Sequence, residues 1–165
     1  MQHSMHSRHS RPGSAQQGLT LVELMVVVAI MSILAMLSAQ FGFQWSNSAK
    51  VTQTQASLQQ AYAIAKSTAL QNYRAQAGGS AAAVLCLSSA QLNVFQGGSC
   101  SGSAVWTRPV ASGVAIQFGS PAATALCIAL SNAAIPLSTA SAGTCATNLT
   151  YSITAGSANA SKNLY

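Results

Sequence analysis

Gly18-Leu19-Thr20-Leu21-Val22-Glu23-Leu24, followed by the apolar run from Met25 to Leu37, is the stretch that decides the fold of this chain. A helix needs about 20 mostly apolar residues to cross the hydrocarbon core of a bilayer, and the segment from Leu19 to Phe43 is long enough. Glu23 lies inside this segment and is the only Asp or Glu among all 165 residues. The presence of a carboxylate in such a helix therefore needs an explanation.

An ionised side chain deep in a membrane helix costs about 2.5 to 3.5 kcal/mol, so it indicates a function and a partner. The nearest basic residues are Arg11 and Lys50, and Lys50 is about 40 Å away along a helix. Cleavage after Gly18 would give Leu19 a new α-ammonium one helical turn from Glu23. That cation could pair with the carboxylate in the same molecule or in a neighbour.

The stretch from Gly18 to Leu37 resembles the class III signal of type IV pilins and type II secretion pseudopilins. In that family a prepilin peptidase cuts after the glycine and methylates the new amine. The resemblance therefore implies cleavage between Gly18 and Leu19, an N-methylated Leu19, and a role for Glu23 in assembly with other subunits. Gln40 stands where major pilins usually carry a helix-kinking proline, which favours a minor subunit.

An ordinary single-pass anchor or an uncleaved secretory signal is the alternative. A secretory signal places its cleavage site after the apolar run, at small residues of the A-x-A kind. The stretch Leu37-Ser38-Ala39-Gln40 approximates that pattern poorly. The basic leader, residues 1–18, precedes the run in either interpretation and keeps its own end in the cytoplasm. We therefore expect a single-pass protein of the inner membrane, whose residues 44–165 form a periplasmic or extracellular domain.

The helical period continues beyond the apolar run. Apolar side chains recur at steps of three and four residues, the stripe of an amphipathic helix packed on a sheet: Leu58, Tyr62, Ala65, Ala69 and Tyr73. We expect one helix from Leu19 to Tyr73, or to about residue 75, with Gly42 as its weakest point and Gly78-Gly79 ending it. The stretch from Leu58 to Asn72 also resembles the helix of the minor pilins and pseudopilins called H-type or fimbrial-T-like.

Short β-type runs follow Gly79, separated by Gly, Ser and Pro, with tight connections that suit antiparallel pairing. The predicted strands are Ala82–Ser88, Gln91–Phe95, Ala104–Thr107, Val114–Phe118, Leu126–Leu130 and Leu149–Thr154. This order predicts an α+β protein, and it resembles the pilin fold: a long N-terminal helix, residues 19–43 in the membrane or filament core, packed through its second half on a C-terminal antiparallel sheet.

The four cysteines all lie in residues 44–165. Cysteines pair in an oxidising compartment, and four of them allow three connectivities. We favour Cys86 with Cys100 and Cys127 with Cys145, because each pair closes a short loop rich in Gly and Ser. A disulfide that closes a loop of this length stabilises the folded state by about 3 kcal/mol. No C-x-x-C pair is present, which argues against zinc and thioredoxin-like redox chemistry.

Residues 44–165 contain no Asp, Glu or His, because the three histidines, His3, His6 and His9, lie in the leader. A carboxylate pair or a Ser-His-Asp or Cys-His arrangement cannot be assembled from this set, and no phosphate-binding glycine motif is present. We expect no enzyme, no cofactor and no metal site.

Two non-enzymatic functions remain. In the first, the protein is a minor pilin, or a type II secretion pseudopilin, that enters, primes or caps a type IV pilus-like filament. In the second, the subunit binds DNA for uptake through the possible contacts Arg74, Arg108 and Lys162, helped by aromatic residues such as Trp106 and Tyr165. After loss of the leader, five basic side chains and Glu23 leave a net charge of only +4. Convergence of the basic residues on one face would favour DNA.

Overall fold

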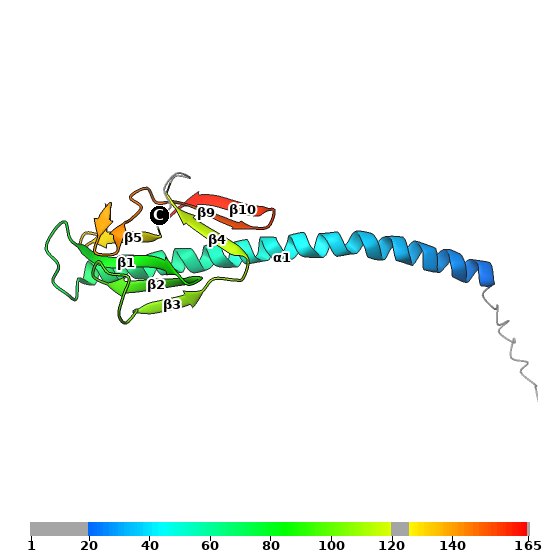
Figure 1. Cartoon of the computed structure of the whole chain (residues 1–165), viewed down its shortest axis with the longest axis horizontal. Helices are drawn as coiled ribbons and strands as arrows, with labels where there is room; N and C mark the ends of the chain where they lie inside the picture. Colours follow the sequence, from blue (N-terminus) through cyan, green and yellow to red (C-terminus); the bar gives the residue numbers. More distant parts are fainter. Residues whose placement is uncertain (1–19, 120–125, 165) are drawn as a thin grey trace, which may run out of the picture. The chain divides into compact units, whose positions relative to one another are not determined.

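The structure is a computed structural model that describes residues 20–119 and 126–164, except for the side chains of residues 39–43. The chain forms two compact units, residues 1–40 and residues 41–165. One helix, α1 (Leu21–Gln71), contributes to both units, and all of the described strands follow it in the second (Figure 1). The order, one long helix and then a β-rich half, is the α+β arrangement of a pilin.

The described part of the first unit is the apolar portion of α1. This helix begins at Leu21 because Thr20 caps it: the Glu23 backbone N–H donates to Thr20 Oγ1 over 3.2 Å, and the Leu24 N–H donates to the Thr20 carbonyl over 3.1 Å. A capping side-chain oxygen satisfies an N–H group that the first helical turn leaves unpaired. The following residues as far as Ser38 include no Gly or Pro that would interrupt the helix.

The second portion of α1 carries the predicted apolar stripe. Leu58, Tyr62, Ala65 and Ala69 are all buried, as the spacing predicts. Tyr73, however, is 70% exposed and lies beyond the end of the helix, so its assignment to the stripe was wrong.

The helix ends at Gln71, well before Gly78-Gly79. Asn72 adopts a left-handed conformation with φ of 43°, which an asparagine tolerates better than most residues. Its side chain then fixes the next turn: the Gln76 backbone N–H donates to Asn72 Oδ1 over 2.8 Å, and Asn72 Nδ2 donates to the Gln76 carbonyl over 3.0 Å. The predicted end at Tyr73, or about residue 75, was therefore late, because a local side-chain cap and not the glycine pair ends α1.

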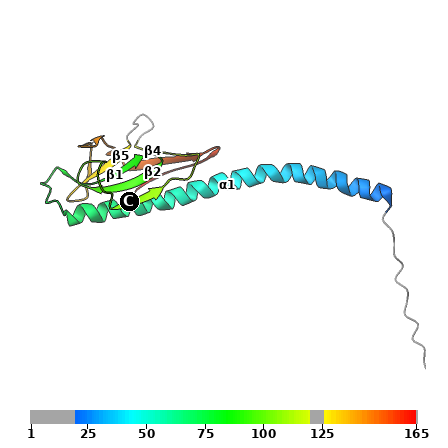
Figure 2. The same ribbon diagram turned by 60° about the horizontal axis from the view of Figure 1, so that its bottom comes forward.

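The strands form three antiparallel sheets among the described residues. The largest has the order β3 (Trp106–Pro109), β2 (Gln91–Gln96), β1 (Ala81–Ser88), β5 (Cys127–Ser131) and β6 (Pro136–Leu137). A three-stranded sheet has the order β10 (Ala158–Asn163), β9 (Thr150–Ala155) and β4 (Val114–Phe118), and a small ribbon pairs β7 (Thr139–Ala140) with β8 (Gly143–Thr144). Figure 2 shows the larger two sheets on the same side of the second portion of α1.

Most of the strand predictions are close to the structure. Strand β4 has the predicted bounds, whereas β1, β2, β5 and β9 differ by a residue at one or both ends, and β3 begins at Trp106, two residues later than predicted. Four strands were missed: β6, β7, β8 and β10. Strand β10 consists of Ala, Asn, Ser and Lys, which are weak strand formers, so it depends on its pairing with β9 across the turn at Gly156-Ser157.

Both faces of the five-stranded sheet are covered. Leu85, Val94 and Ile128 face the main core, which they share with α1 and with the three-stranded sheet. Val84, Phe95 and Ala129 face the opposite way, into a second cluster that contains Cys86, Cys127 and Cys145. This two-sided burial explains why β1 and β5 are almost uniformly apolar instead of alternating.

Both cysteine pairs that the loop lengths favoured are disulfides in the structure. The Cα atoms are 5.9 Å apart in the bond Cys86–Cys100 and 4.8 Å apart in Cys127–Cys145. Each bond joins a strand of the large sheet to a following loop. The two disulfides thus hold the loops over the sheet face that α1 does not cover.

Candidate functional site: the apolar helix segment and its carboxylate

Glu23 lies in the first turn of α1, at the third helical position after the Thr20 cap. The pattern Thr-x-x-Glu before an apolar run is the sequence signature of a capping box, and Thr20 is a site residue that the analysis of the sequence missed despite this signal. A negative charge in the first turn is also favoured by the helix dipole. The position of Glu23 therefore has a local structural explanation in addition to a functional one.

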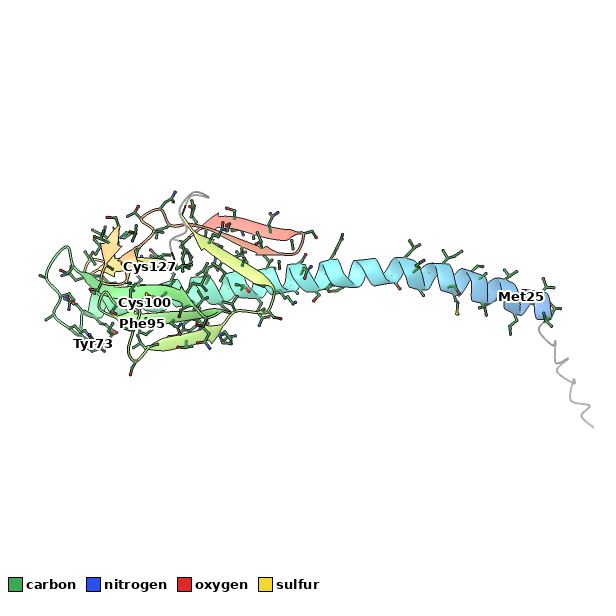
Figure 3. The ribbon with its side chains drawn as sticks, in the orientation of Figure 1. Met25, Tyr73, Phe95, Cys100 and Cys127 are labelled. Carbon is green, nitrogen blue, oxygen red and sulfur yellow. A yellow bond between two sulfur atoms is a disulfide. The ribbon has the colours of Figure 1, made fainter. Side chains whose placement is uncertain are left out.

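Apolar side chains surround the helix after Glu23 and have no partner within the described residues. The large hydrophobic side chains of this segment are each 46% to 79% exposed: Leu21, Val22, Leu24, Met25, Val26, Val27, Val28, Ile30, Met31, Ile33, Leu34, Met36 and Leu37. They project outward from the ribbon, as Met25 does in Figure 3. Burying so many apolar groups elsewhere is strongly favourable, so this surface requires an apolar environment.

The few polar groups of this segment suit such an environment. The Ser32 hydroxyl donates to the Val28 carbonyl over 2.8 Å, and the Ser38 hydroxyl donates to the Ala35 carbonyl over 3.0 Å. Hydroxyls bonded within their own helix can enter hydrocarbon without losing a hydrogen bond. Among the described residues, Leu21–Ser38 is the segment long and apolar enough to span a membrane, with a mean hydropathy of 2.5. It fits a membrane anchor.

Glu23 has no cation beside it in this portion of the helix, because the sequence has no Lys, Arg or His between Arg11 and Lys50. Lys50 belongs to the second unit, where its Nζ donates to the Ser112 carbonyl over 3.4 Å. Gly18 and Leu19, the predicted cleavage and methylation positions, lie outside the described residues. Pairing of Glu23 with the Leu19 ammonium remains a prediction.

The three basic residues considered for DNA contact lie on three different elements. Arg74 follows the end of α1 and approaches Gly97, whose Cβ, if it had one, would be 3.6 Å from Arg74 Cδ. Arg108 lies on β3 opposite Leu92, and Leu92 and Gly97 are about 16 Å apart along the β2 strand. Lys162 lies on β10 of the other sheet. The structure does not bring these charges into one cluster.

The aromatic residues proposed as stacking partners do not supply a platform beside these charges. Trp106 is partly buried and packs against the main core, and Tyr165 lies outside the described residues. Trp45 is 79% exposed and follows the apolar segment of the sequence, which is typical of an aromatic residue at a membrane interface.

Two buried tyrosines are electrostatically perturbed. Burial raises the pKa of Tyr62 above its ordinary value of 10.0. Burial also raises the pKa of Tyr151, and the nearby Gln59 side chain partly opposes that rise. The Tyr151 hydroxyl is fully buried and makes no hydrogen bond of standard geometry to the described residues. Both tyrosines belong to the core of the domain, and neither contributes to the apolar segment.

Comparison with protein families finds the prokaryotic N-terminal methylation motif at residues 13–39. This match includes the glycine, the capped first turn, Glu23 and the apolar segment. Comparisons with characterised proteins and with solved structures found no match. The prepilin-type motif implies processing by prepilin peptidase and assembly with other pilins. Together with the α+β arrangement of one apolar N-terminal helix and an antiparallel β-rich domain, the motif makes this chain similar to the type IV pilins and pseudopilins and supports a pilin-like protein.

Proposed function

We propose that this protein is a minor subunit of a type IV pilus-like filament, in which it primes or caps assembly. The observation that carries the proposal is the exposed apolar surface of Leu21–Ser38 with a single carboxylate at its start. The absence of a proline at Gln40 supports a minor subunit. The same features are compatible with a pseudopilin of a type II secretion filament, which is the alternative within this class.

In this proposal the leader, residues 1–18, is removed and Leu19 becomes the methylated N-terminus. Residues 19–43 anchor the precursor in the inner membrane and later enter the filament core, while residues 44–165 form the periplasmic domain. The role is non-enzymatic, since residues 44–165 contain no Asp, Glu or His that could act as an acid or base. DNA binding is not favoured, because Arg74, Arg108 and Lys162 lie on separate elements.

Glu23 is the assembly charge. Helices that bundle into a filament core create a medium of low dielectric, where a lone carboxylate is costly unless a cation meets it. The Leu19 ammonium of the adjacent subunit supplies that cation. Because glutamine is also accepted at this position of a capping box, Glu23→Gln removes the charge and keeps a side chain suited to the helix start.

The test compares sheared filament fractions with membrane fractions for the wild type and Glu23→Gln. The variant is expected in the membrane at the wild-type level, with an N-terminus at Leu19 by sequencing, and depleted from filaments. Filament entry equal to that of the wild type would refute the charge-pair role. An N-terminus at Met1, or one after Ala39, would refute the pilin-type function itself.

A further inference from the structure

The four cysteines lie together on the face of the five-stranded sheet that α1 does not cover. Cys86 on β1 and Cys127 on β5 are direct cross-strand partners in the register of the sheet. Each belongs to a different disulfide, with Cys100 and Cys145 as the respective loop partners. Figure 3 shows Cys100 and Cys127 in the same part of the domain.

The pairing of Cys86 with Cys127 is of the non-hydrogen-bonded kind. The Leu87 N–H donates to the Leu126 carbonyl over 2.8 Å, so the hydrogen-bonded positions are the neighbouring pair. In a non-hydrogen-bonded antiparallel pair the Cα atoms are about 4.5 Å apart and the side chains are close. A disulfide accepts Cα separations of about 4.4 to 6.8 Å. The register of the two strands therefore places Cys86 and Cys127 in the kind of pair whose usual Cα separation a disulfide accepts.

One surface hollow opens onto this set of sulfurs. It has a volume of about 350 Å³ and is lined by Cys86, Cys100 and Cys127. Cys86, Cys127 and Cys145 are buried, at 1%, 4% and 4% exposure, whereas Cys100 is half-buried. An external thiol therefore reaches Cys100 more easily than it reaches the other three cysteines.

We propose that the two disulfides form an exchange relay in which Cys86 and Cys127 can become a third, cross-strand bond. An external dithiol attacks Cys100 as a thiolate, forms a mixed disulfide there and releases Cys86 as a thiolate. Cys86 then attacks Cys127, so that the Cys86–Cys127 bond forms and Cys145 leaves as a thiolate. The second thiol of the reductant releases Cys100, and both loop thiolates take up protons.

Overall, the relay reduces the protein by two electrons. Two protein disulfides and one dithiol give one protein disulfide, two protein thiols at Cys100 and Cys145, and the oxidised reductant. The attacking species is a thiolate and the exchange passes through mixed disulfides, as in thiol–disulfide chemistry generally. The sheet stays cross-linked throughout.

Release of both loops would uncover the second apolar cluster. The loops contact each other, since the Ala142 N–H donates to the Gly98 carbonyl over 2.7 Å. They also cover Val84, Phe95 and Ala129. Reduction by one dithiol would therefore convert a closed apolar face into an exposed one without unlinking β1 from β5.

The first test uses Cys100→Ser in the full chain, with Cys86→Ser as the matched control. Samples of Cys100→Ser are alkylated with iodoacetamide before and after incubation at pH 8.5. The relay predicts that Cys86 carries the label in the first sample and that Cys145 carries it in the second. Peptide mapping should then find the Cys86–Cys127 bond. In the control, which lacks one of the facing cysteines, the label should stay on Cys100. Label that stays on Cys86 in Cys100→Ser would overturn the proposal.

The second test keeps every cysteine and so does not depend on the folding of a variant. The wild-type protein is treated with one equivalent of dithiothreitol, quenched in acid, alkylated and mapped. The expected first product has label on Cys100 and Cys145 and a Cys86–Cys127 bond. Label on Cys86 and Cys100 with an intact Cys127–Cys145 bond, or simultaneous loss of both native bonds without the new one, would refute the relay.

Discussion

Thr20 and Glu23 show how one short stretch can serve two purposes. Thr20 Oγ1 accepts the Glu23 N–H and starts α1, while the Glu23 side chain carries the charge that we propose for assembly. The cap and the charge are on different residues, so each can be removed without the other.

Thr20→Ala is predicted to weaken the first turn of α1 and to leave filament entry close to the wild-type level. Loss of a threonine cap costs about 0.5 to 2 kcal/mol of local helix stability, but Glu23 and its charge remain. The measurement is the ratio of filament to membrane protein, beside Glu23→Gln. If Thr20→Ala were depleted as strongly as Glu23→Gln, helix capping and not the charge would explain Glu23.

Tyr151→Phe is predicted to stabilise the domain by about 1 kcal/mol at neutral pH, because it removes a buried hydroxyl without a standard hydrogen bond. The raised pKa of Tyr151 means that the folded state holds this proton more tightly than the unfolded state. Relative to its ionised form, the protonated Tyr151 hydroxyl therefore favours the folded state. This contribution to the free energy of unfolding is present below pH 10 and is lost as the pH rises through the raised pKa. Tyr151→Phe should lose less stability than the wild type in that alkaline range.

Thermal unfolding between pH 7 and pH 11 checks this prediction, with Tyr73→Phe as the control, because Tyr73 is 70% exposed. The control should follow the wild-type profile. Destabilisation by Tyr151→Phe at neutral pH would show that the hydroxyl is satisfied in solution, for example by water.

The β9–β10 hairpin shows how a single glycine can place a whole strand. Gly156 has a φ of 56° in the turn, and an added Cβ would lie 2.7 Å from Asn47 Nδ2 on α1. The turn therefore needs a residue that both accepts a left-handed conformation and lets the hairpin approach the helix. Strand β10, whose residues favour strands weakly, follows this turn and pairs with β9.

Gly156→Ala is predicted to destabilise the domain more than Gly113→Ala does. Both positions have positive φ, at 56° and 77°, but nothing lies within 4 Å of a Cβ at Gly113. A non-glycine residue in the left-handed region costs about 1 to 2 kcal/mol, and only Gly156→Ala adds the clash with Asn47. Unfolding in urea measures the difference.

Asn47→Ala supplies the matching control for the hairpin. If the clash is the cause, the double variant Gly156→Ala/Asn47→Ala should cost less than the sum of the two single variants. Additive costs would contradict the proposed contact and leave the backbone conformation as the whole effect.

At the scale of the whole molecule, the large sheet divides the domain into a helix-covered face and a loop-covered face. The helix-covered face joins both larger sheets in one core. The other face is small and depends on the two disulfides to hold the loops against it. Loss of the bonds should therefore affect stability more than it affects the apolar segment of α1.

Each of the double variants Cys86→Ala/Cys100→Ala and Cys127→Ala/Cys145→Ala is predicted to lower the free energy of unfolding by about 3 kcal/mol, the value for loops of this length. Membrane insertion and cleavage after Gly18 should be unchanged. Thermal unfolding in detergent measures the first effect, and N-terminal sequencing measures the second. A change below about 0.5 kcal/mol, within the usual range for neutral surface substitutions, would contradict the structural role of the bonds.

The sequence by itself determined the apolar part of α1, the stripe from Leu58 to Ala69 and the two short disulfide loops. These features depend on residues close in the chain, where an unbroken apolar run, a helical period or a short loop is sufficient. The carboxylate of Glu23 was equally evident from the sequence, because Glu23 is the only acidic residue in the chain.

Only the tertiary structure decided that β10 is a strand and that the basic residues stay apart. The end of α1 was also predicted wrongly, but it depends on a local cap, the bonds between Asn72 and Gln76. Strand β10 is fixed by its register with β9. The facing of Cys86 and Cys127 likewise depends on which strands pair. Composition cannot predict these outcomes, because their stabilisation comes from partners that the fold, and not the local sequence, brings alongside.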